Sequence, residues 1–447
     1  MKVAILGAGE SGTGAAILAK QLGYQVKVSD GGVIAEPYRH QLQQYHIDFE
    51  EKGHTLEEIL AADQIVKSPG IADTVPVVKA ALAKGIPVIS EIEFAARYTS
   101  ARFIAISGTN GKTTTTLLTY HLLKSGEQKV VLAGNVGESF ARQVAIERRE
   151  GTSVDWYVLE ISSFQLDNCY WFHPQIAVLL NITPDHLDRY QNSMELYTAA
   201  KLRLLQNMNS NDAFIYYAQD PILSAAVARC PVAAKVFPIT QEQFAGDYIQ
   251  VAGHRFGQLP LVGKHNMINM AAAIQAALLA GATPQQVQQA LPNFVNAPHR
   301  LQKVGEWNGV TFINDSKATN VDAAMYALGA FQRPIIWIAG GKDKGNDYDL
   351  IRHLVQQKVK ALVCMGKDNS KLYNYFSGIV PQIADTHSME EAIKAAWDFA
   401  CPGDVVLLSP ACASFDLFQN YQDRGKQFAD MCQQLGPIKQ RETAELA

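Results

Sequence analysis

Cysteine pairs, basic clusters and long apolar runs are all missing from this chain of 447 residues. The six cysteines are scattered without a C-x-x-C pair, which favours reduced thiols over a disulfide framework or a zinc site. The formal net charge of -4 leaves no basic excess to neutralise a nucleic-acid backbone. No apolar run reaches the roughly 18 residues of a membrane span, and the first residues lack a secretory signal pattern. We therefore predict a cytoplasmic protein without nucleic-acid partners or a membrane span.

The composition that is present, 48% hydrophobic and 18% charged residues, is typical of globular proteins. The length predicts about three domains. Short β-branched runs alternate with helical patterns along the whole chain, which predicts an α/β fold with mainly parallel sheets and flanking helices. We place the domains at residues 1–97, 98–297 and 298–447. The first and third are expected to be Rossmann-like, and the central one a P-loop-type ATPase domain.

The first glycine-rich turn, "GAGESG" at residues 7–12, fits the pattern G-x-G-x-x-G, and Asp30 ends the next predicted strand. This arrangement is typical of a dinucleotide fold, in which the acidic residue holds the ribose. The same glycines are needed wherever a strand turns tightly into a helix whose N-terminus meets a phosphate. NAD, a uridine or other nucleotide diphosphate, and a purely structural turn therefore all stay open at this point.

The second turn, "GTNGKTT" at residues 108–114, departs from the usual phosphate-loop template G-x-x-x-x-G-K-[ST]. Ile106 stands where the template has its first glycine, and the glycine is instead Gly108. The shorter loop still offers inward-facing backbone N–H groups, the charge of Lys112 for β- and γ-phosphates, and the hydroxyl of Thr113 for magnesium. The following helix adds the positive end of its dipole. We predict an ATP site, with a surface turn as the alternative.

The shortened loop resembles the nucleotide loop of the Mur ligase superfamily, and the resemblance covers nearly the whole chain. Further motifs that carry it are "SPG" (68–70), "GNVG" (134–137), "EISSFQL" (160–166), "NITPDHLDRY" (181–190), "YTAAKLR" (197–203), "GKHNMIN" (263–269), "PHR" (298–300), "NDSKATN" (314–320), "GGKDKG" (340–345) and "LSPACASFD" (408–416). "NDSKATN" and "SPACASFDLF" are similar to the D-glutamate-adding branch. The D-N-P-R signature of the diaminopimelate-adding branch is absent from the sequence.

The resemblance implies an ADP-forming ligase of peptidoglycan precursor synthesis that joins D-glutamate to UDP-N-acetylmuramoyl-L-alanine. A carboxylate is a poor electrophile because oxide is a prohibitive leaving group, so ATP converts it into an acyl phosphate that the amine attacks through a tetrahedral intermediate. We expect small-molecule substrates and a monomer. Other amino-acid ligases of the superfamily, an NAD-linked oxidoreductase and a non-catalytic nucleotide-binding scaffold are the alternatives.

The resemblance also implies catalytic residues and two magnesium ions. The catalytic set is Lys112, Glu160, His186, Lys201 and Lys317, and the metal set is Thr113, Glu160, His186 and Lys201. A lysine on an apolar helical stripe most often extends its amine to water, and without the family we would expect that of Lys201. The position instead matches the lysine that CO2 carbamylates in the family, which turns a cation into an anionic oxygen ligand. Burial would favour the neutral amine that reacts.

Three sets of binding residues follow from the matching motifs. For ATP they are Gly108, Thr109, Asn110, Gly111, Lys112, Thr113, Thr114, Asn266, Asn269, Arg300 and Asp315. For the UDP-sugar they are Gly9, Glu10, Ser11, Gly12, Asp30, Ser68, Gly70, Asn135, Ser162, Gln165 and His186. For D-glutamate they are Thr319, Lys344, Ser414 and Tyr421, where Tyr421 replaces an expected phenylalanine. "GGKDKG" also departs from the commoner G-G-D-G-K, which leaves the hydrogen bonding around Lys344 open.

Overall fold

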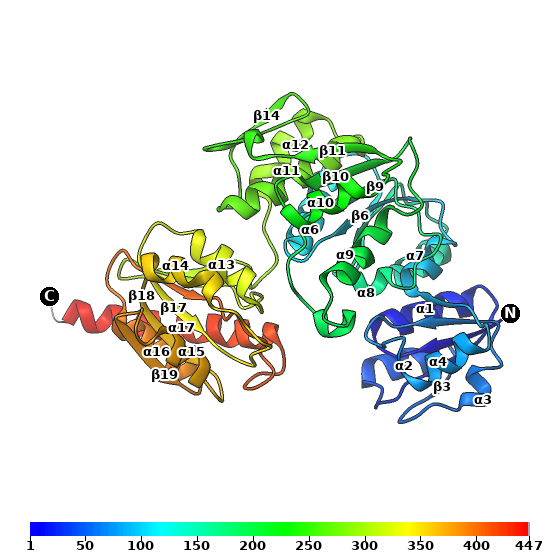
Figure 1. The fold of residues 1–447 in the computed structure, drawn as a ribbon, viewed down its shortest axis with the longest axis horizontal. Coiled ribbons are helices and arrows are strands. Elements are labelled where there is room, and N and C mark those ends of the chain that lie inside the picture. The colour runs from blue at the N-terminus through cyan, green and yellow to red at the C-terminus, as the bar shows by residue number, and fades with distance from the viewer. Residues whose placement is uncertain (446–447) are drawn as a thin grey trace. The chain divides into compact units, whose positions relative to one another are not determined.

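The computed structural model describes residues 1–445, and these fold into three main sheets with helices along their faces (Figure 1). The predicted α/β class with mainly parallel sheets is confirmed. Among the described residues, no helix is long and apolar enough to cross a membrane. The chain forms two compact units, one of Met1–Pro260 with Met267–Phe294 and one of Leu261–Asn266 with the chain from Val295 onward.

The first sheet is parallel throughout and has the order β3-β2-β1-β4-β5, which is Rossmann-like. Its strands are β1 (Lys2–Leu6), β2 (Gln25–Ser29), β3 (Asp48–Glu50), β4 (Gln64–Lys67) and β5 (Val88–Ser90). Its helices are α1 (Glu10–Gln21), α2 (Glu36–Gln44), α3 (Leu56–Ile59), α4 (Pro76–Ala83) and α5 (Glu91–Ala96). Gly12 lets α1 begin against the preceding turn, since a Cβ there would lie 1.8 Å from the Gly7 carbonyl oxygen.

The second sheet is also parallel, with the order β11-β10-β9-β6-β8-β7. Its strands are β6 (Arg102–Ser107), β7 (Val130–Gly134), β8 (Trp156–Glu160), β9 (Ile176–Leu179), β10 (Ala213–Tyr217) and β11 (Lys235–Ile239). The helical segments that follow these strands are α6 (Lys112–Lys124), α7 (Phe140–Glu150), α8 (Ser163–Leu166), η1 (Leu187–Tyr190), α9 (Met194–Leu202), η2 (Arg203–Leu205), α10 (Pro221–Arg229) and η3 (Gln241–Gln243). β6 and β8 end together because Ile106 pairs with Glu160 in register, so the loops after both strands open at one sheet edge.

A small antiparallel sheet of β12 (Phe244–Ala245), β13 (Tyr248–Val251) and β14 (His254–Phe256) follows η3. The chain then forms α11 (Lys264–Leu279), α12 (Pro284–Ala290) and η4 (Leu291–Asn293). The third main sheet has the order β15-β16-β20-β17-β18-β19, in which only the β15–β16 pair is antiparallel.

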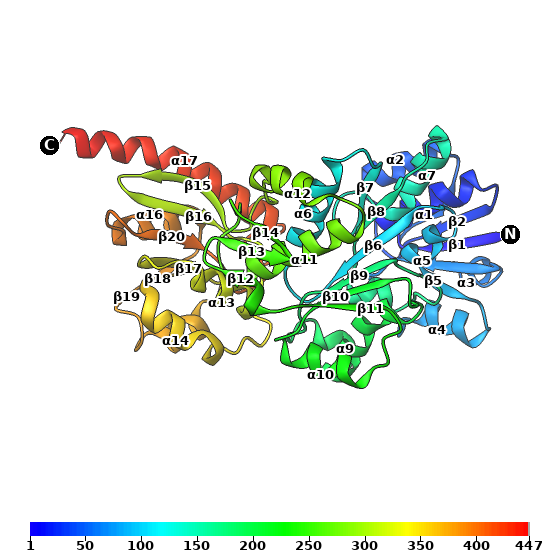
Figure 2. The same cartoon turned by 90° about the horizontal axis from the view of Figure 1, so that it is seen from above.

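The strands of the third sheet are β15 (Gln302–Trp307), β16 (Val310–Asn314), β17 (Ile335–Ala339), β18 (Val359–Met365), β19 (Gln382–Thr386) and β20 (Val405–Leu408). Its helices are α13 (Val321–Gly329), α14 (Asp349–Lys358), α15 (Ser370–Phe376), α16 (Met389–Phe399) and α17 (Tyr421–Glu445). In this unit α17 runs beside β15 (Figure 2). The fully buried strands β17 and β20 form its centre, as expected for parallel strands covered on both faces.

Candidate active site

The nucleotide loop, residues 108–111, connects β6 to α6 and owes its shape to glycine and asparagine. Gly108 and Gly111 have φ angles of 146° and 84°, which favour glycine. A side chain at Gly111 would also meet Asn269, since a Cβ there would lie 2.3 Å from its Oδ1. Asn181 holds Asn110 at both ends: its Oδ1 accepts the Asn110 N–H at 2.8 Å and its Nδ2 donates to the Asn110 carbonyl at 3.1 Å. The loop is thus fixed before α6 begins.

Two lysines donate to the same carbonyl oxygen in this loop. Lys112 Nζ lies 2.9 Å from Gly108 O and 2.7 Å from Thr109 O, while Lys201 Nζ lies 2.7 Å from Gly108 O. Thr113 and Thr114 follow on α6, with Thr114 buried. Thr109 is buried and shares a contact of 3.1 Å between its Oγ1 and the Tyr197 hydroxyl. The sequence-predicted catalytic residues Lys112 and Lys201, on separate helices, are therefore neighbours.

Lys201 is buried, with only 1% of its surface exposed, and its Nζ lies 4.6 Å from the centre of the Tyr197 ring. Burial lowers the pKa of Lys201 well below its ordinary value, the Lys112 charge lowers it further, and Asp185 opposes both. The side chain therefore does not extend to water, as a lysine on an apolar helical stripe most often does. Folding has instead placed an amine with a lowered pKa beside Lys112, at the start of α6.

Glu160 ends β8 at the same sheet edge and is 2% exposed. Its Oε1 accepts a hydrogen bond of 2.6 Å from Asn135 Nδ2, and the Asn135 N–H donates to the Glu160 carbonyl at 2.8 Å. Its other carboxylate oxygen, Oε2, is buried without a hydrogen-bond partner among the described residues. A buried carboxylate oxygen with no donor is costly unless a cation or a water molecule approaches it.

His186 stands in the loop between β9 and η1, with φ of 52° and a half-exposed side chain. Its Nε2 lies 3.6 Å from Asp185 Oδ2, and its ring meets the Phe164 ring edge at 5.2 Å between centroids. Asp188 follows at the start of η1. The His186 ring thus has the Asp185 carboxylate and the Phe164 ring as neighbours.

Arg189 lies in η1 and connects this segment to the loop after β4 of the first sheet. Its guanidinium stacks 4.5 Å from the centre of the Phe164 ring and donates to the carbonyls of Pro69, Gly70 and Ile71 at 2.9, 3.3 and 3.0 Å. From the other side, Lys67 Nζ also donates to the Ile71 carbonyl at 2.6 Å. The loop after β4 is therefore held by hydrogen bonds from Lys67 and Arg189, and Arg189 places it relative to the loop that carries His186.

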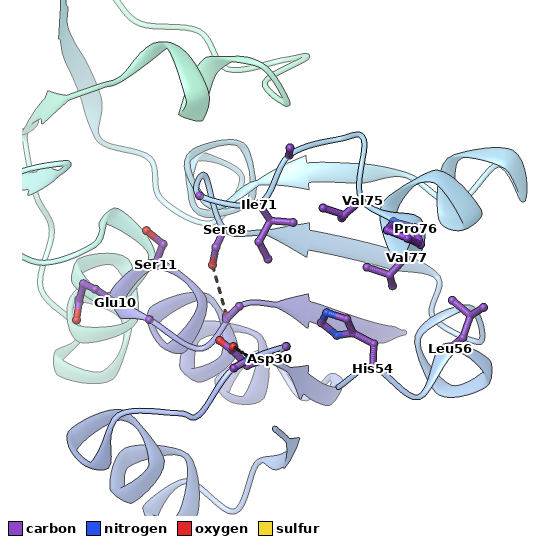
Figure 3. A pocket seen from close by; sticks show the side chains of 16 residues that line it. Glu10, Ser11, Asp30, His54, Leu56, Ser68, Ile71, Val75, Pro76 and Val77 are labelled. Carbon is purple, nitrogen blue, oxygen red and sulfur yellow. Dashed lines mark hydrogen bonds between the residues drawn. The ribbon is translucent and has the colours of Figure 1, made fainter. Parts of the chain in front are cut away.

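The N-terminal pocket is a cavity of about 940 Å³ at the carboxyl ends of the first sheet's strands (Figure 3). It is lined by Gly7, Gly9, Glu10, Ser11, Asp30, Gly31, Gly32, His54, Leu56, Ser68, Gly70, Ile71, Ala72, Val75, Pro76 and Val77. Asp30 braces its floor by accepting the N–H groups of Ala8 at 2.7 Å and Gly32 at 2.8 Å. Six of the eleven residues predicted for the UDP-sugar thus line one cavity: Gly9, Glu10, Ser11, Asp30, Ser68 and Gly70.

Glu10 and two other residues predicted for the UDP-sugar, Ser162 and Gln165, have side chains that form hydrogen bonds or ion pairs with neighbouring residues. Glu10 forms an ion pair with Arg142, with 2.7 Å between Oε1 and Nε. Ser162 and Gln165 form the capping box of α8, in which Gln165 Oε1 accepts the Ser162 N–H at 2.9 Å. These contacts give all three a structural role, and Glu10 offers the pocket its backbone more readily than its carboxylate.

In the second unit, "NDSKATN" and "LSPACASFD" are joined by the fully buried Arg424. Its guanidinium donates to Ser316 Oγ at 3.0 Å, to the Ser316 carbonyl at 2.9 Å and to the Cys412 carbonyl at 3.2 Å. Asp315 accepts from the Leu301 N–H at 3.1 Å and from Ser409 Oγ at 2.9 Å, and burial raises its pKa to about 7. These bonds hold the ends of β16 and β20 together.

The residues expected around D-glutamate lie on loops of that unit, except Tyr421, which begins α17. Lys317 Nζ lies 4.0 Å from the centre of the Tyr421 ring, so the tyrosine ring supports the lysine. Ser414 is buried, Thr319 is half-buried and Lys344 is exposed. Arg300 contributes to the electrostatic field at Asp315, and Asn266 Nδ2 donates to the Val262 carbonyl at 2.8 Å.

The "GGKDKG" loop adapts to its shifted acidic residue by folding around it. Asp343 Oδ1 accepts the Gly345 and Asn346 N–H groups at 2.7 and 3.1 Å and pairs with Lys371 at 3.0 Å. An antiparallel bridge between Lys342 and Ala413 places this loop beside the segment that carries Ser414. Asp343 is therefore a loop brace, and Lys344 projects from a loop that is fixed on both sides.

Sequence reasoning did not assign Arg189, Asn181, Arg424 or His54. Arg189 and Asn181 lie inside a motif that was recognised, but their contacts are to distant segments that spacing cannot reveal. Arg424 follows the last recognised motif on α17. No sequence motif points to His54. It lies beside Gly31 only because β3, which precedes His54, pairs with β2, which precedes Gly31.

The arrangement of possible metal ligands bears on the predicted magnesium site. Within residues 1–445, no three His, Cys, Asp or Glu side chains cluster in the way that a complete protein-only metal site requires. Magnesium usually takes only one or two carboxylates and completes its shell with water and substrate phosphates, so this finding fits the ion. The unpartnered Glu160 Oε2 at the edge beside the nucleotide loop is the oxygen that a magnesium ion would use.

Comparison with known protein families matches three segments of the chain. The N-terminal domain of MurD-like Mur ligases matches residues 1–90, the Mur ligase middle domain residues 106–277, and the glutamate ligase domain of Mur ligases residues 299–412. Together these matches cover more than half of the chain.

Among curated proteins, the chain is similar to the UDP-N-acetylmuramoylalanine–D-glutamate ligases of Cytophaga hutchinsonii and Bacteroides thetaiotaomicron. The first is 50% identical, covering 96% of this chain and 98% of that protein, and the second is 47% identical, covering 97% and 100%. Solved structures with the same fold include the UDP-N-acetylmuramate-alanine ligase MurC of Thermotoga maritima, at a TM-score of 0.61 and 18% identity over 97% of this chain and 99% of that one. The MurF ligase of the same organism in complex with ADP gives 0.60 at 16% identity, covering 91% and 94%.

Proposed function

Because the chain belongs to the Mur ligase family, we propose that it catalyses the ATP-dependent joining of D-glutamate to UDP-N-acetylmuramoyl-L-alanine, with ADP and phosphate as the other products. The observation that carries this function is the similarity, along nearly the whole chain, to D-glutamate ligases at 45–50% identity. The reaction belongs to peptidoglycan precursor synthesis. Its substrates are small molecules, and the alternative of an NAD-linked oxidoreductase is set aside.

The nucleotide loop binds the phosphates of ATP. The left-handed conformations of Gly108 and Gly111 turn backbone N–H groups into the loop, and α6 directs the positive end of its dipole there. Lys112 now donates to two loop carbonyls, and it can exchange these for phosphate oxygens at little cost in geometry. Its charge then stabilises the negative charge that gathers on the γ-phosphate during transfer.

Magnesium would be held by Glu160 and the Thr113 hydroxyl, with His186 and Lys201 proposed for a second ion. When bound, magnesium neutralises charge between the γ-phosphate and the approaching substrate carboxylate. Glu160 is prepared for this role because Asn135 orients one of its oxygens and leaves the other without a donor. Asp185 and Phe164 restrain the His186 ring on two sides.

Lys201 is proposed to carry a carbamate. The two amines that share Gly108 O repel each other when both are charged, and burial of Lys201 adds a desolvation cost. A neutral Lys201 amine relieves both effects and is the form that attacks CO2. The resulting anion would lie beside Lys112, so the modification converts a repulsive pair into an attractive one.

The N-terminal pocket binds the UDP part of the sugar substrate. Gly9 to Gly12 open α1 with backbone N–H groups suited to a diphosphate, and Asp30 stands at the end of β2. We propose that residues 1–97 bind the UDP-sugar, residues 98–297 bind ATP and residues 298–447 bind D-glutamate. Thr319, Lys344, Ser414 and Tyr421 stay the proposed D-glutamate residues.

The acyl-phosphate step is tested with oxygen labelling. A substrate carboxylate oxygen attacks the γ-phosphorus as ADP leaves, and the D-glutamate amine later displaces that oxygen as phosphate. With ¹⁸O at both oxygens of the terminal carboxylate of UDP-N-acetylmuramoyl-L-alanine, mass spectrometry should find one labelled oxygen in each phosphate released. Unlabelled phosphate from the labelled substrate would rule out this route.

Replacement of Arg189 by Met should weaken the use of the UDP-linked substrate. The change removes the charged donors that hold three carbonyls of the loop after β4, and we expect a fall in kcat/KM for that substrate of roughly 10- to 100-fold. KM for ATP should change little. Steady-state kinetics with each substrate varied gives both values, and Arg149→Met, at an exposed arginine of α7, is the control. An equal rise in both KM values would contradict a role specific to this loop.

We further propose that the chain acts in the cytoplasm as a monomer. All six cysteines are free thiols, which supports a reducing compartment. Light scattering coupled to gel filtration should give the mass of one chain, and a dimer mass at micromolar concentration would overturn the monomer.

A further inference from the structure

His54 lies on the wall of the N-terminal pocket, in the segment between β3 and α3. Figure 3 shows its ring on the side of the pocket where Asp30 and Leu56 also lie. Its Nδ1 is 2.7 Å from Ser29 Oγ. Its Nε2 faces Gly31, where an added Cβ would lie only 3.3 Å away, so the glycine leaves room around this nitrogen. No residue in the described chain forms a hydrogen bond with Nε2.

The neighbours of Ser29 decide which ring nitrogen carries the proton. Ser29 is fully buried, and its hydroxyl donates to Glu50 Oε1 at 2.7 Å. Burial alone would raise the pKa of Glu50, but hydrogen bonds from Thr55 and Ser29 bring it below its ordinary value, so this carboxylate can only accept. The single hydroxyl proton is thus committed to Glu50, and Ser29 must accept from Nδ1–H. Neutral His54 therefore presents Nε2 to the pocket as an acceptor.

A hydrogen-bond acceptor at this position suits the base of a nucleotide diphosphate better than its phosphates. A phosphate has no proton to donate at neutral pH, and the glycine turn at the start of α1 already provides N–H donors for it. The pocket beyond Asp30 is lined by Leu56, Val75 and Val77, whose apolar side chains suit a flat base. A base that fits must carry an N–H on the edge that meets His54.

We propose that His54 is a specificity-determining residue whose Nε2 accepts a hydrogen bond from the N3–H of the uracil ring. Uracil carries a proton at N3, whereas cytosine has a lone pair there, which would face the lone pair of Nε2. This proposal rests on the proposed function, because it takes the UDP-linked sugar as the substrate. It adds the atom that distinguishes uracil from cytosine.

The test is calorimetric binding of UDP and CDP to the full chain, without ATP or D-glutamate. The wild-type protein should bind UDP at least about 10-fold more tightly than CDP, the scale of one hydrogen bond gained against one acceptor left facing another. His54→Phe keeps a ring but removes both nitrogens, and it should bring the ratio to within about 3-fold. His40→Phe, at an exposed histidine of α2, should keep the wild-type ratio. An unchanged ratio in His54→Phe would overturn the proposal while the ligase function stands.

Two further outcomes separate the possible failures. If the wild-type protein binds neither nucleotide, then both this inference and the assignment of the N-terminal pocket fail. In ¹⁵N spectra of the histidine rings, His54 should carry its proton on Nδ1, and its Nε2 signal should move when UDP is added and not when UMP analogues methylated at N3 are added. A proton on Nε2 in the nucleotide-free protein would overturn the proposal by itself.

Discussion

Replacing Lys112 by Ala should lower the turnover of the ligase by roughly 100- to 1,000-fold, the scale of losing one charge contact in a transition state. The nucleotide loop itself should survive, because Asn181 holds Asn110 from both sides independently of the lysine. The loss should therefore appear mainly in kcat, with the melting temperature little changed. Phosphate release under saturating substrates, together with a thermal melt, measures both quantities.

Lys124→Ala is the matched control for this variant, because Lys124 is an exposed lysine near the C-terminal end of the same helix. Its turnover should stay within about 2-fold of the wild type, as is usual for surface changes away from special contacts. A Lys112→Ala variant that kept more than a tenth of the wild-type turnover would remove the lysine from the catalytic account.

Replacing Lys201 by Ala should impair turnover on a similar scale, about 100-fold or more, because it removes the proposed anionic ligand. Acetate or another small carboxylate should restore part of the activity by filling the space that the side chain leaves. Acetate should not restore Lys112→Ala, since that variant lacks a cation and not an anion. The pair of variants thus distinguishes a carbamate from a merely positive lysine.

Labelling with ¹³CO2 supplies the direct readout for the same residue. The wild-type protein should show a carbamate carbon signal that is absent from Lys201→Ala. Because the lowered pKa of Lys201 favours the amine that reacts with CO2, the signal should form at neutral pH without added base. Absence of both the signal and acetate rescue would remove the carbamate and leave the remaining assignments intact.

The sequence was sufficient to predict the mainly parallel sheets and the glycine turn between β6 and α6, because both depend on local pattern. Buried β-branched runs such as β17 and β20 have few alternatives to a parallel strand. The glycines of the nucleotide loop likewise fix the backbone wherever they occur.

The antiparallel hairpins were missed, although one of them carries a clear signal. Asn308 and Gly309 both have positive φ and connect β15 to β16, which is the Asn-Gly turn that favours a tight hairpin. The turn between β13 and β14 has positive φ at Ala252 and Gly253 in the same way, but an alanine in the sequence does not indicate a positive φ. In β15 the strand residues are also half-exposed and polar, so a buried-strand pattern is absent.

The site was only partly predictable because several motif residues also contact neighbouring residues of the fold. Gln165 reads as a substrate contact but closes a capping box, and Glu10 reads as part of a phosphate turn but pairs with Arg142. Conversely, the hydrogen bonds of Arg189 to the loop after β4 connect residues more than a hundred positions apart in the sequence. Such contacts depend on how two sheets pack, and a single sequence carries no record of that packing.

The most direct test of the account is ATP- and magnesium-dependent phosphate release with UDP-N-acetylmuramoyl-L-alanine and a panel of amino acids. The panel is D-glutamate, L-glutamate, L-lysine, meso-diaminopimelate and L-alanine. We predict release that depends on D-glutamate, with the other four near the background without amino acid. Release that depends on another member of the panel would keep the ATP chemistry and contradict the D-glutamate assignment, and no release with any of them would contradict the ligase function.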